Sequence, residues 1–163
     1  MGREPCVLAI CGCKNSGKTA LIEQLVTKLR EKEHTVAYIK HDGHEFGADE
    51  QGTDSCRMQQ AGAGATVVFS KTKYMMVEQG AVTFEALIRR FASYDLILIE
   101  GAKATDLPKF EIVRTGVSQI PISRREGRLG IITDIIDFQS EERLLPLNDI
   151  SAILEFCVAY IKE

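Results

Sequence analysis

Glycine, lysine and threonine occur early in the chain at a spacing that suits the binding of phosphate groups. Residues 12–19 read GCKNSGKT, with Lys18 and Thr19 directly after the second glycine. Glycine allows a sharp turn and leaves no Cβ to block an anion, so backbone N–H groups can point at phosphate oxygens. Lys18 supplies a positive charge, and the Thr19 hydroxyl suits the coordination shell of Mg²⁺. The predicted nucleotide-binding residues of this segment are Gly12, Cys13, Lys14, Asn15, Ser16, Gly17, Lys18, Thr19 and Ala20.

The segments on either side of this glycine-rich stretch predict how it is positioned. Residues 6–11 form an almost wholly apolar run, which is typical of a strand buried on both faces. Apolar residues then recur at helical spacing, which predicts a helix over residues 17–31. A helix that begins at the loop directs its unpaired N–H groups and the positive end of its dipole at the phosphates. This context favours a phosphate-binding loop over a plain glycine-rich turn.

An acidic residue lies where an enzyme with a phosphate-binding loop would need one. Residues 94–101, YDLILIEG, predict the clearest buried strand in the chain, and Glu100 lies at its carboxyl end. An acid at that position commonly lies near Mg²⁺ and its water ligands. Lys18 and Glu100 are therefore the predicted catalytic residues, and Thr19 and Glu100 the predicted metal residues. Asp95, at the other end of the strand, is expected to cap or solvate its start.

Residues 41–57 are polar and read as a long functional loop. His41 and His44 have a spacing that suits a metal ion, a phosphate or a solvated loop equally well. In the same stretch, Asp54, Ser55 and Arg57 suit a segment that senses a terminal phosphate. They also suit a cap, with Asp54 or Ser55 starting a short helix through residues 57–60.

Basic and acidic residues late in the chain suggest further contacts. Lys103, Lys109 and Arg114 form either a solvated basic face or a site for a second phosphorylated ligand. Residues 124–128 add three arginines and are expected to form a mobile connection. Asp134 follows a predicted strand and could accept hydrogen bonds from guanine, although no N-K-x-D element accompanies it.

Strand-like and helix-like segments alternate along the chain, which predicts an α/β architecture. We expect a three-layer P-loop NTPase-type fold with a mostly parallel central sheet, in one nucleotide-binding domain over residues 1–163. A helix is expected over residues 84–91, with Thr83 as its N-cap, and another from residue 148 onward. The further strands are expected at residues 35–40, 65–69, 74–78, 110–114 and 129–133.

Composition excludes several classes of protein. The 163 residues are 45% hydrophobic and 26% charged, with a net charge of −3. No global basic field therefore draws the protein to nucleic acid or to an anionic membrane. The start of the chain predicts no leader segment, and no apolar run approaches the length of a spanning helix. The five cysteines form no disulfide framework, so we expect a cytoplasmic protein.

Several motifs in order resemble one known family, molybdopterin-guanine dinucleotide biosynthesis protein B (MobB). They are the phosphate loop, residues 39–44 (IKHDGH), 52–57 (GTDSCR), 61–63 (AGA), 99–103 (IEGAK) and 108–114 (PKFEIVR). The resemblance implies a homodimer that binds GTP and Mg²⁺, has weak GTPase activity and assists the guanylyltransferase MobA in attaching GMP to molybdopterin. It also implies that the site for nucleotide, cofactor or partner is lined by His41, His44, Asp54, Ser55, Arg57, Lys103 and Lys109.

Other functions share the same loop. A metallochaperone GTPase of the nickel-insertion kind would use His41, His44 and Cys13, although the chain has no His-rich tract. A small-molecule kinase would carry Arg124, Arg125 and Arg128 on a lid that excludes water. A nucleotide-binding interaction module would have the same loop and no useful catalysis.

Overall fold

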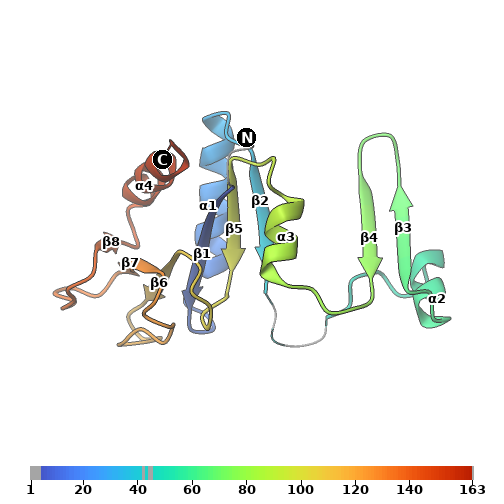
Figure 1. Ribbon diagram of the computed structural model, residues 1–163. Helices are drawn as coiled ribbons and strands as arrows, with labels where there is room; N and C mark the ends of the chain where they lie inside the picture. Colours follow the sequence, from blue (N-terminus) through green and yellow to red (C-terminus); the bar gives the residue numbers. More distant parts are fainter. Residues whose placement is uncertain (1–4, 42, 44–45, 163) are drawn as a thin grey trace. The chain divides into compact units, whose positions relative to one another are not determined.

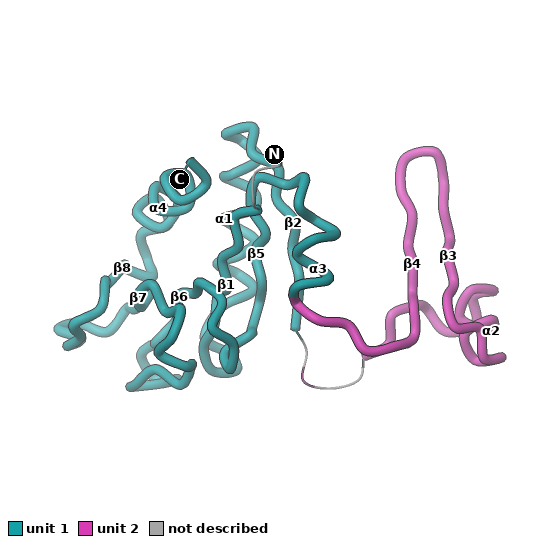
Figure 2. Tube along the Cα trace, viewed as in Figure 1, with its two compact units in different colours: residues 1–41, 85–163 teal, residues 42–84 magenta. Residues whose placement is uncertain are grey.

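The computed structural model describes residues 5–41, 43 and 46–162. The chain forms two compact units, drawn in different colours in Figure 2. The first comprises residues 1–41 and 85–163, and the second residues 42–84. The sequence predicts one nucleotide-binding domain over the whole chain, and the structure adds that two compact units lie within it.

A six-stranded parallel sheet forms the centre of the first unit (Figure 1). Its strand order is β2-β5-β1-β6-β7-β8, so the first strand lies inside the sheet, with a neighbour on each side. Every residue of β5 and β6 is buried, as expected of strands covered on both faces. The strands are β1 (Cys6–Gly12), β2 (Val36–Lys40), β5 (Leu96–Glu100), β6 (Lys109–Val113), β7 (Arg128–Thr133) and β8 (Leu144–Pro146).

Two helices pack on one face of this sheet, and a third lies on the other side (Figure 1). Helix α1 (Lys18–Glu31) and helix α4 (Ile150–Lys162) pack on one face, and their apolar side chains join those of the central strands in one core. Helix α3 (Phe84–Arg90) crosses in front of β2 in Figure 1, on the side of the sheet away from α1. These layers confirm the predicted α/β fold with a mostly parallel sheet and flanking helices.

The second unit holds a helix and a hairpin. Helix α2 (Asp54–Gln60) is followed by strands β3 (Ala65–Phe69) and β4 (Tyr74–Glu78), which pair antiparallel with Ala65 opposite Glu78 and Phe69 opposite Tyr74. The prediction of two strands here is confirmed. Most side chains of the hairpin are exposed, since each strand has a single half-buried position.

Two local predictions need correction, and one strand was not predicted. The side chain that caps α2 is that of Thr53, which accepts from the Cys56 N–H at 3.2 Å, and not that of Asp54 or Ser55. The strand β8 has no counterpart among the predictions, because three residues are too few to show a periodicity. Arg128 is the first residue of β7 and no part of a mobile connection.

Candidate functional site

The loop between β1 and α1 has a backbone that only glycine adopts easily. Gly12 has a φ of 141° and Gly17 a φ of 94°, both in the region that disfavours side chains. A Cβ at residue 12 would lie 2.8 Å from the Ile112 carbonyl oxygen and 2.9 Å from Ser16 Oγ. The loop therefore packs tightly against the neighbouring strand β6, and its shape depends on the two glycines.

The loop leads directly into the amino end of α1. Lys18 is the first helical residue, and Gly17 provides no side chain to cap the helix. The ammonium group of Lys18 donates to the Gly12 carbonyl oxygen at 3.1 Å and to that of Cys13 at 2.7 Å. The charge thus lies over the loop, where the first-turn N–H groups also favour an anion. A triphosphate fits this donor set.

Three side chains meet on the other side of the loop. The Thr19 hydroxyl donates to the Glu100 carboxylate, with both oxygens at 3.1 Å. The Tyr38 hydroxyl donates to Oε2 of the same carboxylate at 2.7 Å. Mg²⁺ in nucleotide sites takes few protein ligands, usually a hydroxyl and one acid, with phosphate and water oxygens as the rest. Thr19 and Glu100 fit that role, and Tyr38 is a neighbour that the sequence analysis missed.

The position of Tyr38 beside Glu100 affects both groups. The pKa of Tyr38 lies well above its ordinary value, because partial burial and then the hydrogen bond and charge of Glu100 disfavour the phenolate. Tyr38 therefore stays a hydrogen-bond donor over the whole physiological pH range. In the sequence, Tyr38 is only one hydroxyl-bearing residue within a predicted strand, and this is too little to assign it a role.

We expect Tyr38→Phe to reduce the gain in nucleotide affinity that Mg²⁺ provides by about 3- to 10-fold, because Glu100 loses one of its two hydroxyl donors. The measurement is nucleotide affinity titrated against Mg²⁺ concentration. Tyr94→Phe is the matched control, since Tyr94 is similarly exposed and packs edge-on against Phe91. Identical Mg²⁺ curves for Tyr38→Phe and the wild type would contradict the prediction.

Two charged residues stand on the side of the loop nearest β6 and β7. Arg114 follows the last residue of β6, and Asp134 follows the last residue of β7. Their side chains approach to 3.7 Å between Arg114 Nε and Asp134 Oδ2. Arg114 also lies against the loop, since a Cβ at Gly17 would lie 3.1 Å from Arg114 Nη1. Asp134 was predicted from sequence, whereas Arg114 was noted only as one of several basic residues.

The predicted partner residues of the first unit differ in their surroundings. The His41 N–H donates to the Glu100 carbonyl oxygen at 3.0 Å, so the start of this loop lies beside the acid. Lys103 is exposed, and its carbonyl oxygen accepts from the Arg124 N–H at 2.9 Å. His44 lies outside the described residues.

The prediction that Lys109 lines an open site is wrong. It is fully buried and pairs in the sheet with Ala9, three residues before the loop begins at Gly12. Its ammonium group donates to the carbonyl oxygens of Thr105 at 2.7 Å and Leu107 at 3.2 Å, and also to that of Glu126. A buried cation must find such acceptors, so Lys109 ties together two loops inside the protein.

The predicted sensing residues lie in the second unit and form a local cluster. Arg57 and Asp54 are one turn apart on α2, with an ion-pair distance of 3.5 Å and largely exposed side chains. The pKa of Asp49 lies below its ordinary value, chiefly because the Ser55 hydroxyl donates to its carboxylate. These interactions stabilise the start of α2, although the cap itself is Thr53 and neither Asp54 nor Ser55. The sensing role stays a prediction.

The cysteines around the loop have distinct environments. The Cys11 thiol is buried and donates to the Gly101 carbonyl oxygen at 2.7 Å, and its burial raises its pKa to about 12. Such a thiol is not a ready metal ligand, because the thiolate is disfavoured. Within residues 5–41, 43 and 46–162, no group of three or more His, Cys, Asp or Glu side chains is arranged to hold a metal ion. No observation on these residues favours the metallochaperone alternative.

The fold and the loop together define a class. A parallel sheet, a glycine-rich turn after an inner strand and a helix that starts at the turn make this an α/β protein of the P-loop type. In the part of the chain that the structure describes, no helix has the length and apolarity needed to span a bilayer.

Comparison with known proteins narrows the class to one family. The family described as molybdopterin guanine dinucleotide synthesis protein B (MobB) matches residues 7–134. The chain therefore belongs to the MobB family. It is similar to the molybdopterin-guanine dinucleotide biosynthesis adapter proteins of Haemophilus influenzae, at 28% identity over 92% of this chain and 86% of that protein, and of Escherichia coli, at 27% over 96% and 94%.

Solved structures agree on the fold. A crystal structure of a molybdopterin-guanine biosynthesis protein B superimposes with a TM-score of 0.74, at 23% identity, and covers 96% of this chain and 99% of that one. The structure of Bacillus subtilis MobB gives a TM-score of 0.73 at 21% identity, over 94% and 96% of the two chains. At these identities the likeness establishes the arrangement of elements.

Proposed function

We propose that this chain binds GTP with Mg²⁺ at the loop of residues 12–19 and acts as an adapter in the formation of molybdopterin guanine dinucleotide. The observation that carries the proposal is the loop geometry: a glycine cradle closed by β6, with the Lys18 ammonium over it and the Thr19–Glu100 pair beside it. Family membership supports the pathway, since the curated relatives are described as adapter proteins of this biosynthesis. The nucleotide would be held mainly through its phosphates.

The same geometry supports slow hydrolysis of GTP. Water would attack the terminal phosphate in line, and Lys18 would stabilise the charge that develops on the phosphate oxygens. Mg²⁺, when bound by Thr19 and Glu100, would offset further negative charge. The loop of residues 12–19 contains no glutamine that would orient the water. In related enzymes an arginine finger alone contributes about 10³–10⁵ in rate. We therefore expect turnover far below about 1 per second without a partner.

An adapter needs a partner, and we propose the guanylyltransferase MobA, with molybdopterin as the shared ligand. The partner-facing residues would be those on the exposed parts of the site, among them His41 and Lys103. All five cysteines are free thiols, which supports a reducing compartment such as the cytoplasm.

We propose further that the chain is a homodimer that associates through the β3–β4 hairpin. Large apolar side chains gather there with high exposure: Val67 54%, Phe69 81% and Tyr74 64%. Pairing of this ribbon with a second copy of the chain would bury these exposed side chains.

We expect Phe69→Asp to shift the chain from dimer to monomer, because a carboxylate would have to be buried in the apolar contact. Sedimentation over a range of concentrations measures the result. Ile136→Asp is the matched control, since Ile136 is a similarly exposed apolar residue of the first unit, at 87%. A Phe69→Asp variant that remains dimeric would contradict the hairpin as the interface.

The proposed function is tested by titrating the wild-type chain with GTP and ATP in the presence of Mg²⁺, followed by titration of the GTP-loaded chain with purified MobA. We expect micromolar or tighter nucleotide binding and a complex with MobA. Formation of molybdopterin guanine dinucleotide by MobA should rise when the chain is added. A chain that binds neither nucleotide, or that leaves MobA unaffected, would refute the proposal.

A further inference from the structure

The register of the sheet brings Arg114 and Asp134 together beside the phosphate loop. Val113 of β6 pairs with Thr133 of β7, so the next residue of each strand lies at the same level of the sheet. On the other side of β6, Ile112 pairs with Gly12, the first residue of the loop. Arg114 therefore emerges between the loop and Asp134, at the carboxyl edge where ligands of parallel sheets bind.

The guanidinium group of Arg114 reaches the loop itself. A Cβ at Gly17 would lie 3.1 Å from Nη1, so this nitrogen lies against the backbone from which α1 begins. Among the described residues, no hydrogen-bond acceptor partners Nη1 or Nη2, and the side chain is 44% exposed. A charged donor is thus held next to the N–H groups that would bind phosphate, with its terminal nitrogens available.

The contacts of the Asp134 carboxylate suit a role in positioning Arg114. Its Oδ1 accepts from the Thr115 N–H at 2.7 Å, and its Oδ2 faces Arg114 Nε at 3.7 Å. The Ser118 hydroxyl oxygen accepts from the Arg114 N–H at 3.2 Å, which braces the same turn. To recognise guanine, a carboxylate must present both oxygens to the N1–H and the exocyclic amine. The oxygens of Asp134 instead face the turn after β6.

We propose that Arg114 is a ligand of the nucleotide phosphates and that Asp134 is its positioning residue, with no contact to the base. The inference rests on the proposed function, because it requires a nucleotide at the loop. Its physical basis is that Arg114 adds a second cation beside Lys18, with planar donors that match phosphate oxygens. Since phosphates are common to all nucleotides, Arg114 strengthens binding without selecting a base.

The first experiment compares Arg114→Ala with the wild type by calorimetric titration with GTP, GDP and ATP, each with Mg²⁺. We expect a loss of affinity of about 10- to 100-fold for GTP and GDP, and the same factor for ATP where it binds. Arg114→Lys should retain part of the affinity, because it keeps the charge and loses the planar fork. Arg30→Ala is the charge-matched control, about 18 Å farther along α1 than Lys18.

The second experiment separates positioning from base recognition with Asp134→Asn and two nucleotides, GTP and xanthosine triphosphate. If Asp134 positions Arg114, the variant binds both nucleotides more weakly than the wild type does, by similar factors. If Asp134 reads guanine, the variant loses GTP and gains xanthosine triphosphate, because the amide complements the changed base edge. That second result would overturn the positioning role.

A structural effect would be visible in the protein without nucleotide. We expect Arg114→Ala and Asp134→Asn to unfold at nearly the wild-type temperature, because their ion pair is long, at 3.7 Å, and its Arg114 side is exposed. An Arg114→Ala chain that binds GTP as tightly as the wild type overturns this inference and leaves the proposed function intact. A wild-type chain that binds no nucleotide overturns both.

Discussion

Lys18→Ala is expected to lower the affinity for GTP and Mg²⁺ by at least about 100-fold. The ammonium group already lies over the loop, where it donates to the carbonyl oxygens of Gly12 and Cys13. When a triphosphate binds, the same group would move to oxygens that carry full negative charge. The variant loses this charge-assisted contact, and the triphosphate then faces the two carbonyl oxygens, which repel it.

The measurement is calorimetric titration with GTP, repeated with purified MobA present. Lys32→Ala serves as the control, since Lys32 is an exposed lysine beyond the far end of α1 and its loss changes the net charge equally. Unfolding temperatures of both variants without nucleotide should stay near that of the wild type. GTP affinity of Lys18→Ala within about threefold of the wild type would remove the loop from the nucleotide site. Binding of MobA that survives in Lys18→Ala would show that the adapter contact does not need the nucleotide.

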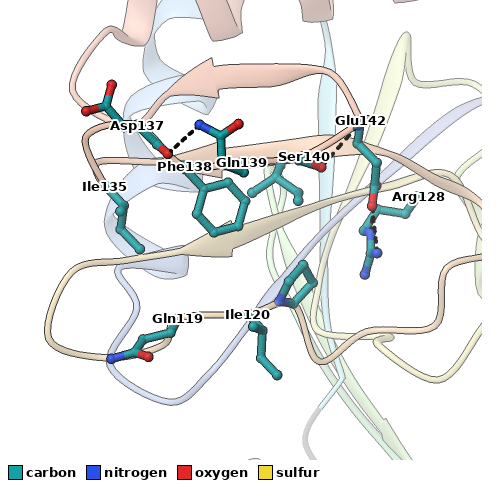
Figure 3. A pocket seen from close by; sticks show the side chains of 11 residues that line it. Gln119, Ile120, Arg128, Ile135, Asp137, Phe138, Gln139, Ser140 and Glu142 are labelled. Atoms are coloured by element: carbon teal, nitrogen blue, oxygen red, sulfur yellow. Dashed lines mark hydrogen bonds and ion pairs between the residues drawn. The ribbon is translucent and has the colours of Figure 1, made fainter.

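Arg128→Met is expected to destabilise the protein by about 3–5 kcal/mol, because it removes the buried cation that faces the carboxylates of Glu111 and Glu142. The Arg128 side chain is 8% exposed and donates to both oxygens of Glu142, at 2.7 and 2.8 Å. Its Nη1 also lies 3.3 Å from Glu111 Oε2. Figure 3 shows Arg128 and Glu142 on the wall of a pocket. The pocket has a volume of about 460 Å³, and its lining includes no residue of the phosphate loop.

The effect of Arg128→Met should depend on pH with a defined sign. The hydrogen bond from Arg128 and its charge lower the pKa of Glu142 from the ordinary 4.5. A carboxyl with a lowered folded-state pKa contributes stability above its unfolded pKa and loses it as the pH falls through the folded value. The difference in unfolding free energy between variant and wild type should therefore be largest near about pH 7 and smaller near about pH 4.

Urea unfolding at both pH values measures this difference. Arg125→Met is the matched control, because Arg125 pairs with the same Glu142 at 3.4 Å but has a side chain that is 62% exposed. An exposed pair contributes little, so we expect a change below about 1 kcal/mol. Equal effects of the two substitutions would contradict the assignment of Arg128 as the buried partner. The result also bears on the kinase alternative, because a lid needs arginines that are free to move.

Much of the site followed from the sequence because it depends on adjacent residues. The loop of residues 12–19, the strand before it and the helix after it are consecutive, and their periodicity and glycines predict the local geometry. Glu100 was predicted for a similar reason, because an acid at the carboxyl end of a buried strand lies at the edge of the sheet. Asp95 was expected at the start of that strand, where it accepts from the Thr35 N–H and hydroxyl at 2.7 Å.

Residues that act through distant partners were misjudged or missed. Lys109 and Arg128 read as surface charges, since nothing in their neighbours along the chain reveals the carbonyl oxygens and carboxylates that surround them. Tyr38 reads as an ordinary strand residue until β2 is paired with β5. The hairpin was predicted as two strands, whereas the exposure of its apolar side chains was not.

The amino-acid sequence by itself determined the P-loop class, the family and the order of strands and helices, because these depend on residue types at short spacings. The tertiary structure alone decided which charges are buried, which hydroxyl supports Glu100, and that Arg114 and Asp134 meet beside Gly17. Such pairings depend on the register of parallel strands whose residues lie far apart in sequence, and a periodic pattern carries no information about which strand lies beside which.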